Sequence, residues 1–318
     1  MRNSAAEIQS DVVSMYSAHP FPNCKDKLEI ASRRMGLRLR CCGITPTDYV
    51  GRHLLDAGCG TGEYACWFAS QGAEVTGIDL SDGSLQGARA YADRVGLERV
   101  RFEKRSVLET GFPDAAFDFI YCTGVLHHTP DPFAGLSELV RVLRPGGTIL
   151  VSLYHRLGLM RGDLQRRLVR RFGGDDLDAR VRWGRRLFPG VTRRNMGDDY
   201  HDPQTVLYDH FAIPHQSLHT VGQMLRWFDR LGLRYLGAFP PARLRDYLPM
   251  LACDEYKSVE PEIQSRLGRT LGRLGTPEKM GRDRPGPFSR FTVQTLWGAC
   301  GIGVFSVGGR KPDAETSN

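Results

Sequence analysis

The sequence predicts an α/β fold built on a parallel β-sheet, and its size, its alternating pattern and one glycine-rich turn support this prediction. The chain has 318 residues with 41% apolar content, which is enough to bury a full core. Up to about residue 155, short apolar runs alternate with longer segments of helical periodicity. The turn lies in "LLDAGCGTGEY", residues 54–64, directly after the first apolar run.

Residues 46–154 are expected to form the core of this sheet. The apolar runs that read as buried strands are 53–58, 73–79, 100–105, 117–123 and 148–154. Helices are expected between them, around 62–70, 82–95 and 132–142. The sequence "RPGG" at 144–147 is expected to end the third helix and turn into the next strand. Such alternation is typical of βαβ units, which give a parallel sheet with right-handed crossovers.

The pattern of strands and helices resumes after each of two long interruptions. Residues 218–240 repeat a helix, a glycine and a strand, and 301–318 hold one more strand, "IGVFSVGG" at 302–309, and a tail. The interruptions, 155–217 and 241–300, are too long for simple loops in a compact domain. We therefore expect two helical insertions that form a cap over the ligand-binding edge of the sheet. Residues 1–45 are expected to form a helical segment that acts as a lid.

Composition sets limits on the cell compartment and on metal binding. The N-terminus lacks the apolar stretch of a signal peptide, and no run reaches the roughly 18 apolar residues of a membrane span. The sequence therefore predicts a cytoplasmic protein without a membrane partner. The 8 cysteines include no C-x-x-C pair, which favours free buried thiols, and no metal site is predicted.

The positive charge of the chain is concentrated in residues 161–195. This block carries 11 Arg and 4 Asp, so it alone accounts for the net charge of +7 of the whole chain. Leu164, Leu168 and Phe172 follow one another at four-residue spacing, which predicts a helix with these side chains facing inward and its arginines in solvent. The alternative is a surface for an anionic partner, such as RNA.

The glycine-rich turn has the features of a ligand-binding loop. Asp56 ends the first strand, and Gly58, Gly60 and Gly62 lead into a helix, where missing side chains let a ligand lie against the backbone. Asp79 ends the second strand about 20 residues on, in position to accept hydrogen bonds from ribose hydroxyls. Dinucleotide-binding turns are related, but here the third glycine comes one residue earlier and the loop has no Lys for phosphates. It suits a ligand that bears a ribose, an ammonium and a sulfonium.

At these residues the sequence resembles the class I S-adenosylmethionine-dependent methyltransferases. "LDAGCGTG" is similar to the family's first motif, "VTGIDLS" to its ribose-binding motif, "FDFIYCTGVLHHTPDP" to the segment after the fourth strand and "LRPGGTILVSLY" to the region of the fifth. The resemblance implies a Rossmann-like, mostly parallel sheet of seven strands flanked by helices, with "IGVFSVGG" as its final antiparallel strand. It also implies S-adenosylmethionine as the cofactor.

The resemblance assigns a role to each residue that matches a motif. The backbone of the glycine turn would hold the methionine part of the cofactor, Asp56 its ammonium, Asp79 the ribose and Leu80 the adenine. Many members carry an acid where this chain has Ser106, so its hydroxyl or the neighbouring backbone must contact the adenine amino group. The full set of expected cofactor-binding residues is Tyr16, Asp56, Gly58, Cys59, Gly60, Thr61, Gly62, Asp79, Leu80, Ser106, Val107 and Thr123.

Tyr16 belongs to this set because "YSAHPFPN", residues 16–23, is similar to a segment that folds across the cofactor in some bacterial members. We expect Tyr16 to act as a lid over the cofactor. The alternative is a turn that only packs Phe21 against the core.

Methyl transfer requires an aligned nucleophile and a dry site, and only sometimes a base. His127 and His128 follow the fourth predicted strand, and a His of near-neutral pKa can deprotonate a hydroxyl or an amine. The alternative is that this pair only fixes the loop by hydrogen bonds. Within 198–220, Tyr208, Asp209 and His215 are expected to orient the substrate rather than to bind a metal.

The sequence therefore predicts a methyltransferase that modifies O, N or C of a small molecule held under a helical cap, with an anionic molecule as one option. One alternative is an RNA-modifying enzyme that uses the Arg-rich block, although no appended RNA-binding module is visible. A second alternative is a catalytically silent fold that only binds the cofactor. The intact glycine loop and acid motifs argue against a silent fold, but they guarantee cofactor binding alone.

Overall fold

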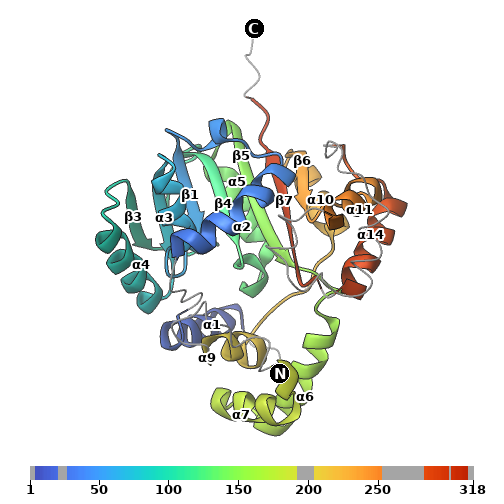
Figure 1. Cartoon of the computed structure of the whole chain (residues 1–318). Helices are drawn as coiled ribbons and strands as arrows, with labels where there is room; N and C mark the ends of the chain where they lie inside the picture. The colour runs from blue at the N-terminus through green and yellow to red at the C-terminus, as the bar shows by residue number, and fades with distance from the viewer. Residues whose placement is uncertain (1–3, 21–26, 192–203, 253–282, 301, 314–318) are drawn as a thin grey trace.

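The computed structural model describes residues 4–20, 27–191, 204–252, 283–300 and 302–313. These residues form one seven-stranded sheet flanked by helices (Figure 1). The strands are β1 (His53–Ala57), β2 (Glu74–Asp79), β3 (Val100–Lys104), β4 (Phe117–Thr123), β5 (Leu143–Tyr154), β6 (Arg234–Phe239) and β7 (Val304–Arg310). Their spatial order is β3-β2-β1-β4-β5-β7-β6, and only β7 runs antiparallel to its neighbours. The predicted sheet, including its antiparallel strand in 302–309, is confirmed.

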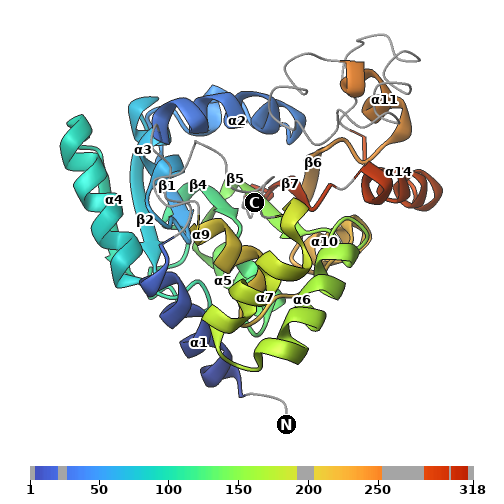
Figure 2. The same ribbon diagram turned by 60° about the horizontal axis from the view of Figure 1, so that its bottom comes forward.

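Helices connect the strands where the sequence predicts them. The crossover helices are α3 (Glu63–Ser70), α4 (Asp82–Val95), α5 (Pro132–Val142) and α10 (Val221–Arg230). Figure 2 shows α2 (Lys27–Cys41) and α3 on one face of the sheet, with α5 and α10 on the other. Because both faces are covered, the central strands are apolar on both sides, and Phe119, Ile120 and Tyr121 of β4 are all fully buried.

The expected turn at 144–147 is wrong, because these residues already belong to β5. α5 ends at Val142 and β5 begins at Leu143. The β4–β5 register is irregular between Phe117 and Phe119, which accommodates the extra residues as a bulge. Arg144 fixes this segment by donating from Nη1 to both carboxylate oxygens of Asp118, each at 2.8 Å.

A group of helices with its own small core lies at the carboxyl edge of the sheet. It comprises α6 (Met160–Gly173), α7 (Leu177–Leu187), the short α9 (Gln204–Leu207) and a π-helical turn, η3 (Tyr208–Ala212), and we call it the helical subdomain. Its buried apolar residues are Val169, Val181, Leu207, Phe211 and Ala212. Figure 1 shows it below the strands, on the same side of the sheet as α1 (Ala5–Ala18).

The predicted inward stripe of α6 is wrong. Leu164, Leu168 and Phe172 are 68%, 42% and 52% exposed. The buried face of the helix instead carries Gln165 and Val169, which lie one position further along the same four-residue spacing. Periodicity identifies an apolar stripe, but it does not say whether a neighbouring element covers it.

The described part of the second insertion lies beside the sheet. It contains α11 (Leu244–Ala252) and α14 (Pro287–Cys300), and α14 packs against α10 and α11. Figure 1 shows both helices next to β6 and β7. Residues 253–282 lie outside the described residues, so a cap formed by 241–300 stays a prediction.

Candidate active site

The turn after β1 is shaped by glycines in the left-handed backbone region. Gly58, Gly60 and Gly62 have φ angles of 82°, 52° and 84°, which other residues rarely adopt. A Cβ atom on Gly58 would lie 2.1 Å from Cγ2 of Val125, and one on Gly62 would lie 2.9 Å from Cβ of Ala88. The loop can therefore follow this path only without side chains at these positions.

Asp79 ties this loop to the end of β2. Its Oδ2 accepts the N–H of Gly60 at 3.0 Å, and its Oδ1 accepts the N–H of Ser81 at 2.9 Å. Burial raises the pKa of Asp79, and these backbone hydrogen bonds oppose the rise. Each carboxylate oxygen has further lone pairs, so Asp79 can still accept hydrogen bonds from ligand hydroxyls.

Two further acids surround the loop. Asp56 is 2% exposed, and among the described residues its Oδ2 has no hydrogen-bond partner. Burial, with the nearby charges of Glu63 and Asp79, raises the pKa of Asp56 to about 8. A cation bound here would be attracted by all three carboxyl groups and would favour the ionised form of Asp56. The acid set therefore fits a ligand with an ammonium group.

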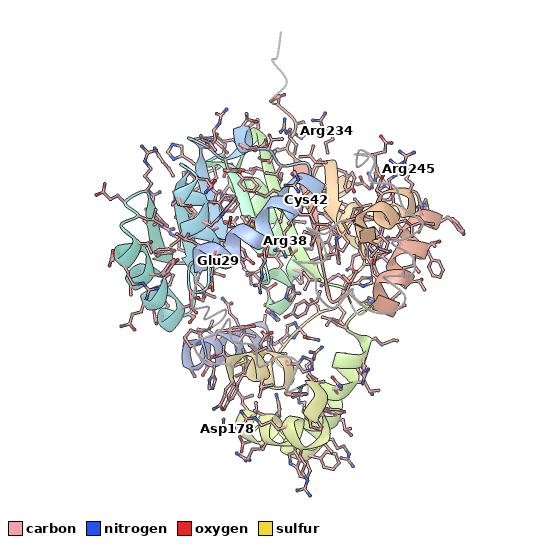
Figure 3. All side chains as sticks on the ribbon, viewed as in Figure 1. Glu29, Arg38, Cys42, Asp178, Arg234 and Arg245 are labelled. Carbon is pink, nitrogen blue, oxygen red and sulfur yellow. The ribbon has the colours of Figure 1, made fainter. Side chains whose placement is uncertain are left out.

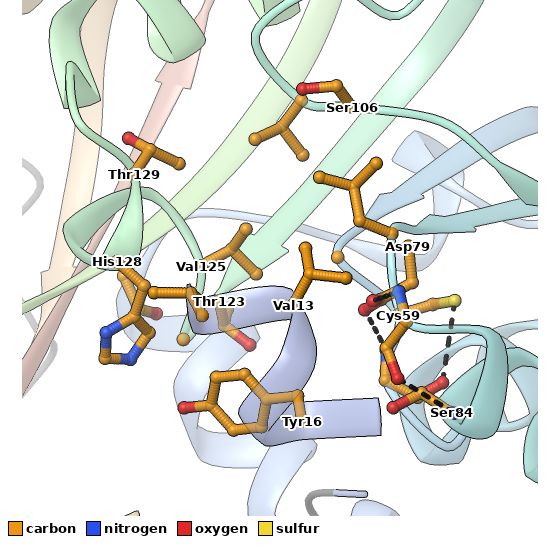
Figure 4. A pocket seen from close by; sticks show the side chains of 18 of the residues that line it. Val13, Tyr16, Cys59, Asp79, Ser84, Ser106, Thr123, Val125, His128 and Thr129 are labelled. Carbon is orange, nitrogen blue, oxygen red and sulfur yellow. Dashed lines mark hydrogen bonds between the residues drawn. The ribbon is translucent and has the colours of Figure 1, made fainter. Parts of the chain in front are cut away.

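A cavity of about 270 Å³ begins at this loop (Figure 4). The sequence-predicted residues that line it are Tyr16, Gly58, Cys59, Gly60, Asp79, Leu80, Ser106, Val107, Thr123, His128 and Asp209. Those that do not line it are Asp56, Thr61, Gly62, His127, Tyr208 and His215. Asp56 is thus covered, and the acid that lines the cavity in its place is Glu63.

Helix α1 crosses the cavity. Figure 4 shows Val13 and Tyr16 reaching from α1 between Asp79 on one side and His128 on the other. The Tyr16 hydroxyl donates to Oδ1 of Asp209 in η3 at 2.8 Å, which joins α1 to the helical subdomain. Burial, followed by the charge of Asp209, raises the pKa of Tyr16 well above its ordinary value, so this phenol stays a hydrogen-bond donor.

His128 is a buried, neutral imidazole on this side of the cavity. Its Nδ1 lies 3.0 Å from the carbonyl oxygen of His215. A carbonyl can only accept, so Nδ1 carries the proton and Nε2 is left as an acceptor. Burial lowers the pKa of His128 to about 4. The ring of Tyr154, at the carboxyl end of β5, stands edge-on to His128 with centroids 5.2 Å apart.

His127 packs against Tyr154, which lines the cavity, and does not line the cavity itself. It is fully buried, and its ring stacks on Tyr154 with centroids 3.6 Å apart. Neither ring nitrogen has a hydrogen-bond partner among the described residues, and burial lowers the pKa of His127 well below its ordinary value. Its backbone carbonyl accepts the N–H of Ser217 at 2.7 Å. This histidine therefore packs and connects rather than facing the cavity.

Tyr208 and His215 point elsewhere. The Tyr208 hydroxyl donates to Asp178 of α7, labelled on the helical subdomain in Figure 3, and its ring stacks on His19 at 3.6 Å. His215 lines a second cavity, next to α6. Tyr208 and Asp209 are consecutive residues of the π-helical turn, yet Tyr208 points to α7 and Asp209 points to the cavity.

Sequence reasoning missed Glu63 and Tyr154, which both line the cavity. Glu63 is an acid in the first turn of α3, immediately after the glycines. Tyr154 is the last residue of β5 and lies at the same edge of the sheet as His127 and His128, which follow β4, so the rule that selected those histidines also indicates it. Ser106 lines the cavity, and its hydroxyl accepts the N–H of Leu108 at 3.1 Å.

Comparison with known proteins gives one family match. Residues 55–151 match the family described as "Methyltransferase domain". The chain is 36% identical over 138 residues to a ubiquinone biosynthesis O-methyltransferase of Alkalilimnicola ehrlichii, covering 43% of this chain and 54% of that protein. It is 41% identical over 128 residues to the 27-O-demethylrifamycin SV methyltransferase of Amycolatopsis mediterranei, covering 39% and 46%. The chain thus spans about half the length of the curated relatives it matches.

Solved structures that are similar over nearly the whole chain include the following one. It is the 1,6-didemethyltoxoflavin-N1-methyltransferase of Burkholderia thailandensis, with bound 1,6-didemethyltoxoflavin and S-adenosylhomocysteine. The TM-score is 0.50 at 16% identity, covering 98% of this chain and 92% of that one, which shows a common fold. Within the described ranges, no helix has the length and apolarity to cross a membrane. No group of three or more potential metal ligands gathers among those residues either.

Proposed function

We propose that this chain, which belongs to the class I S-adenosylmethionine-dependent methyltransferases through residues 55–151, transfers a methyl group from that cofactor to an O, N or C atom of a small molecule. The observation that carries the proposal is that the glycine loop and the Tyr16–Asp209 pair face a single cavity from opposite sides. When bound, S-adenosylmethionine supplies a methyl group that its sulfonium already activates. The protein therefore has to position the acceptor atom, exclude water from the site and accept a hydrogen bond from the acceptor's proton.

The glycine side of the cavity would hold the cofactor. Asp79 is fixed by two backbone N–H groups and would accept the ribose hydroxyls. Glu63 lines the cavity beside the buried Asp56, and together they would attract the ammonium group. Leu80 and Ser106 line the same side and would contact the adenine.

The opposite side would hold the methyl acceptor. His128 is neutral, and its Nε2 can accept a hydrogen bond from an acceptor hydroxyl or amine. A base with a pKa of about 4 removes such a proton only weakly at neutral pH, so His128 would mainly orient the nucleophile. Burial raises the pKa of Asp209, and because the Tyr16 hydroxyl donates its proton to Asp209, the tyrosine oxygen remains as a hydrogen-bond acceptor at the same place.

The size and cover of the cavity favour a small molecule over RNA. A cavity of about 270 Å³ suits a compact ligand, whereas single-stranded RNA requires an open groove with aromatic platforms. The proposed cap consists of α1 and the helical subdomain, which meet at the Tyr16–Asp209 hydrogen bond. Closing this edge would exclude water from the transferred methyl group.

A two-part experiment tests the proposal on the full-length chain. Calorimetric titration with S-adenosylhomocysteine is expected to show one site of micromolar-range affinity, with no comparable binding of NAD. The protein is then incubated with methyl-labelled cofactor and a cell extract separated into RNA and small-molecule pools. Label is expected in the small-molecule pool.

Each other result has a definite meaning. Label in RNA would replace the small-molecule proposal with the RNA-modifying alternative. Cofactor binding without transfer to either pool would favour a silent binding module. Absence of S-adenosylhomocysteine binding would overturn the assignment of the cavity itself.

A further inference from the structure

A second cavity, of about 260 Å³, lies between α6, α7 and the segment 211–216. Four arginine side chains line it: Arg166, Arg167 and Arg170 from α6, and Arg180 from α7. The three on α6 are spaced so that they share one face of the helix. Among the residues that the structure describes, the only acid in its lining is Asp163. We call it the arginine cavity.

The backbone orients the two least exposed arginines toward this space. Nη1 of Arg166 donates to the carbonyl oxygen of His210 at 3.3 Å, and Nε of Arg180 donates to that of Gly174 at 2.7 Å. Arg180 is 4% exposed, and burial lowers the pKa of both guanidinium groups. Both remain cationic, because an arginine does not lose its proton in a protein.

The acids nearby leave positive charge in excess. Asp163 pairs with Arg167 at 2.9 Å, and Asp175 accepts from both Arg170 at 3.3 Å and Arg180 at 3.0 Å. Asp175 is 91% exposed, so solvent screens its pairs strongly.

Arg166 is not hydrogen-bonded to an acid within the described residues. Its hydrogen bonds go to neutral oxygens, the His210 carbonyl and the Gln216 side chain, and Asp163 and Asp209 act on it only as nearby charges. Burying a cation without a directly paired anion is costly, and an anion in the cavity would offset that cost.

We propose that the arginine cavity is a second ligand site, which binds a small oxyanion group, either a phosphate or a carboxylate. Planar guanidinium groups donate two parallel hydrogen bonds to such groups, which an ammonium cannot do. The cavity is large enough for a single group of this kind with its immediate substituents.

The site adjoins the proposed active site through Arg166 and His215. The charge of Arg166 opposes protonation of His128 and Asp209, which line the first cavity. His215 lines the arginine cavity, and its backbone carbonyl accepts the hydrogen bond from Nδ1 of His128. Hence the oxyanion is either free or part of the methyl acceptor, and only the second option rests on the proposed function.

Inorganic phosphate is the probe for the first test. Calorimetric titration of the full-length chain is expected to show one saturable site, and Arg166→Gln and Arg170→Gln are each expected to weaken it by about tenfold or more, as loss of a charge-assisted hydrogen bond does. Arg171→Gln is the matched control, because Arg171 is exposed on the same helix and outside the cavity lining. Arg166→Lys keeps the charge but lacks the paired N–H donors of the guanidinium group, so it is expected to bind phosphate more tightly than Arg166→Gln and more weakly than the wild type.

Two results would overturn the proposal: absence of saturable phosphate binding, or equal loss in Arg171→Gln and the cavity variants. Thermal unfolding and S-adenosylhomocysteine affinity are measured on the same samples. Unchanged values show that a variant is folded and keep failure of this site separate from failure of the proposed function. Should Arg166→Gln unfold the protein, Arg170→Gln decides alone, since that side chain is 60% exposed.

A second test separates the two sources of the oxyanion. The small-molecule pool is divided by anion exchange, and each fraction is assayed with methyl-labelled cofactor in the presence of increasing phosphate. If the acceptor carries the oxyanion, label appears in the retained fraction and phosphate raises the apparent KM. If the anion is free, label appears in the unretained fraction and phosphate changes turnover without raising KM. A phosphate effect that persists unchanged in Arg170→Gln would contradict both.

Discussion

The two sides of the first cavity are built in different ways. The glycine side comes from one short stretch, in which the N–H of Gly60 donates to the Asp79 carboxylate and the N–H of Gly58 donates to the carbonyl of Ile78. The opposite side brings together Tyr16, His128 and Asp209, which are far apart in the sequence and meet only through the tertiary fold. We therefore expect changes on the first side to act on folding and cofactor affinity, and changes on the second to act on turnover.

The largest expected effect is that of Gly58→Ala. The new Cβ would lie 2.1 Å from Val125 in a backbone with a φ of 82°. Overpacking and backbone strain together predict a loss of about 2–5 kcal/mol in the free energy of unfolding, with cofactor binding lost as well. Urea denaturation and calorimetry measure both.

Gly96→Ala is the control for this change. Gly96 also has a positive φ, of 67°, but a Cβ there meets nothing within 4 Å. It should cost only about 1 kcal/mol, the strain of the backbone alone. Equal losses in the two variants would show that the glycine loop is not tightly constrained.

Replacement of His128 probes the opposite side. His128→Ala is expected to lower kcat by about 10²-fold, because the acceptor atom loses its orienting partner, while the Kd for S-adenosylhomocysteine stays within a factor of about two. Since burial lowers the pKa of His128 to about 4, the wild-type rate should show no titration of this residue between about pH 5.5 and 8. A rate inflection near pH 6.5 that disappears in the variant would contradict the neutral, buried assignment.

Asp79→Ala should lower cofactor affinity, which His128→Ala leaves nearly unchanged. Loss of a charged acceptor for the ribose hydroxyls predicts a decrease in affinity of about 1.5–3 kcal/mol. Asp82→Ala is the matched control, since the side chain of Asp82 is 74% exposed and pairs with Lys104 at the surface. If both variants bind S-adenosylhomocysteine like the wild type, Asp79 is not the ribose acceptor.

Per pH unit, the smallest expected effect is the pH dependence of stability set by Asp56. Its pKa of about 8 in the folded protein lies above its value in the unfolded chain, so the folded state binds the extra proton between about pH 4 and 8. Stability should therefore fall as pH rises through this range, by at most about 1.4 kcal/mol per pH unit from this one group.

Asp56→Asn removes this titration. The stability of the variant relative to the wild type should increase from pH 5 to pH 8, as measured by urea denaturation. S-adenosylhomocysteine should reduce the difference, because its ammonium favours the ionised acid and releases the proton. Parallel stability curves for the two proteins would exclude Asp56 as the titrating group.

The fold and the glycine side of the cavity could be predicted from the sequence because their signals are local. Alternating apolar runs mark β1 to β5, and the loop requires glycine at positions such as Gly58 where a side chain has no room. The opposite side has no such signal. That Asp209 faces the cavity while Tyr208 turns to α7 depends on a π-helical turn, which a sequence pattern does not reveal.

Helix α6 shows the same limit for packing. Its apolar stripe of Leu164, Leu168 and Phe172 is real in the sequence but exposed in the structure. The neighbours that decide which face is buried, including Phe211 and Val181, come from other parts of the chain. The arginines were expected in solvent, yet Arg166 and Arg180 are directed into a cavity. For this insertion, periodicity predicted the helix and tertiary contacts determined its orientation.

The position of β7 between β5 and β6 has a consequence for how the molecule is made. The ribosome delivers 304–310 long after both of its neighbours, and β7 is the strand that joins them. Until then β5 has an open outer edge, and β6 has no described partner, so both present unpaired N–H and C=O groups to any strand nearby. A nascent chain that has already built its cofactor loop is therefore still open to intermolecular pairing, and insertion of one late strand closes both edges at once.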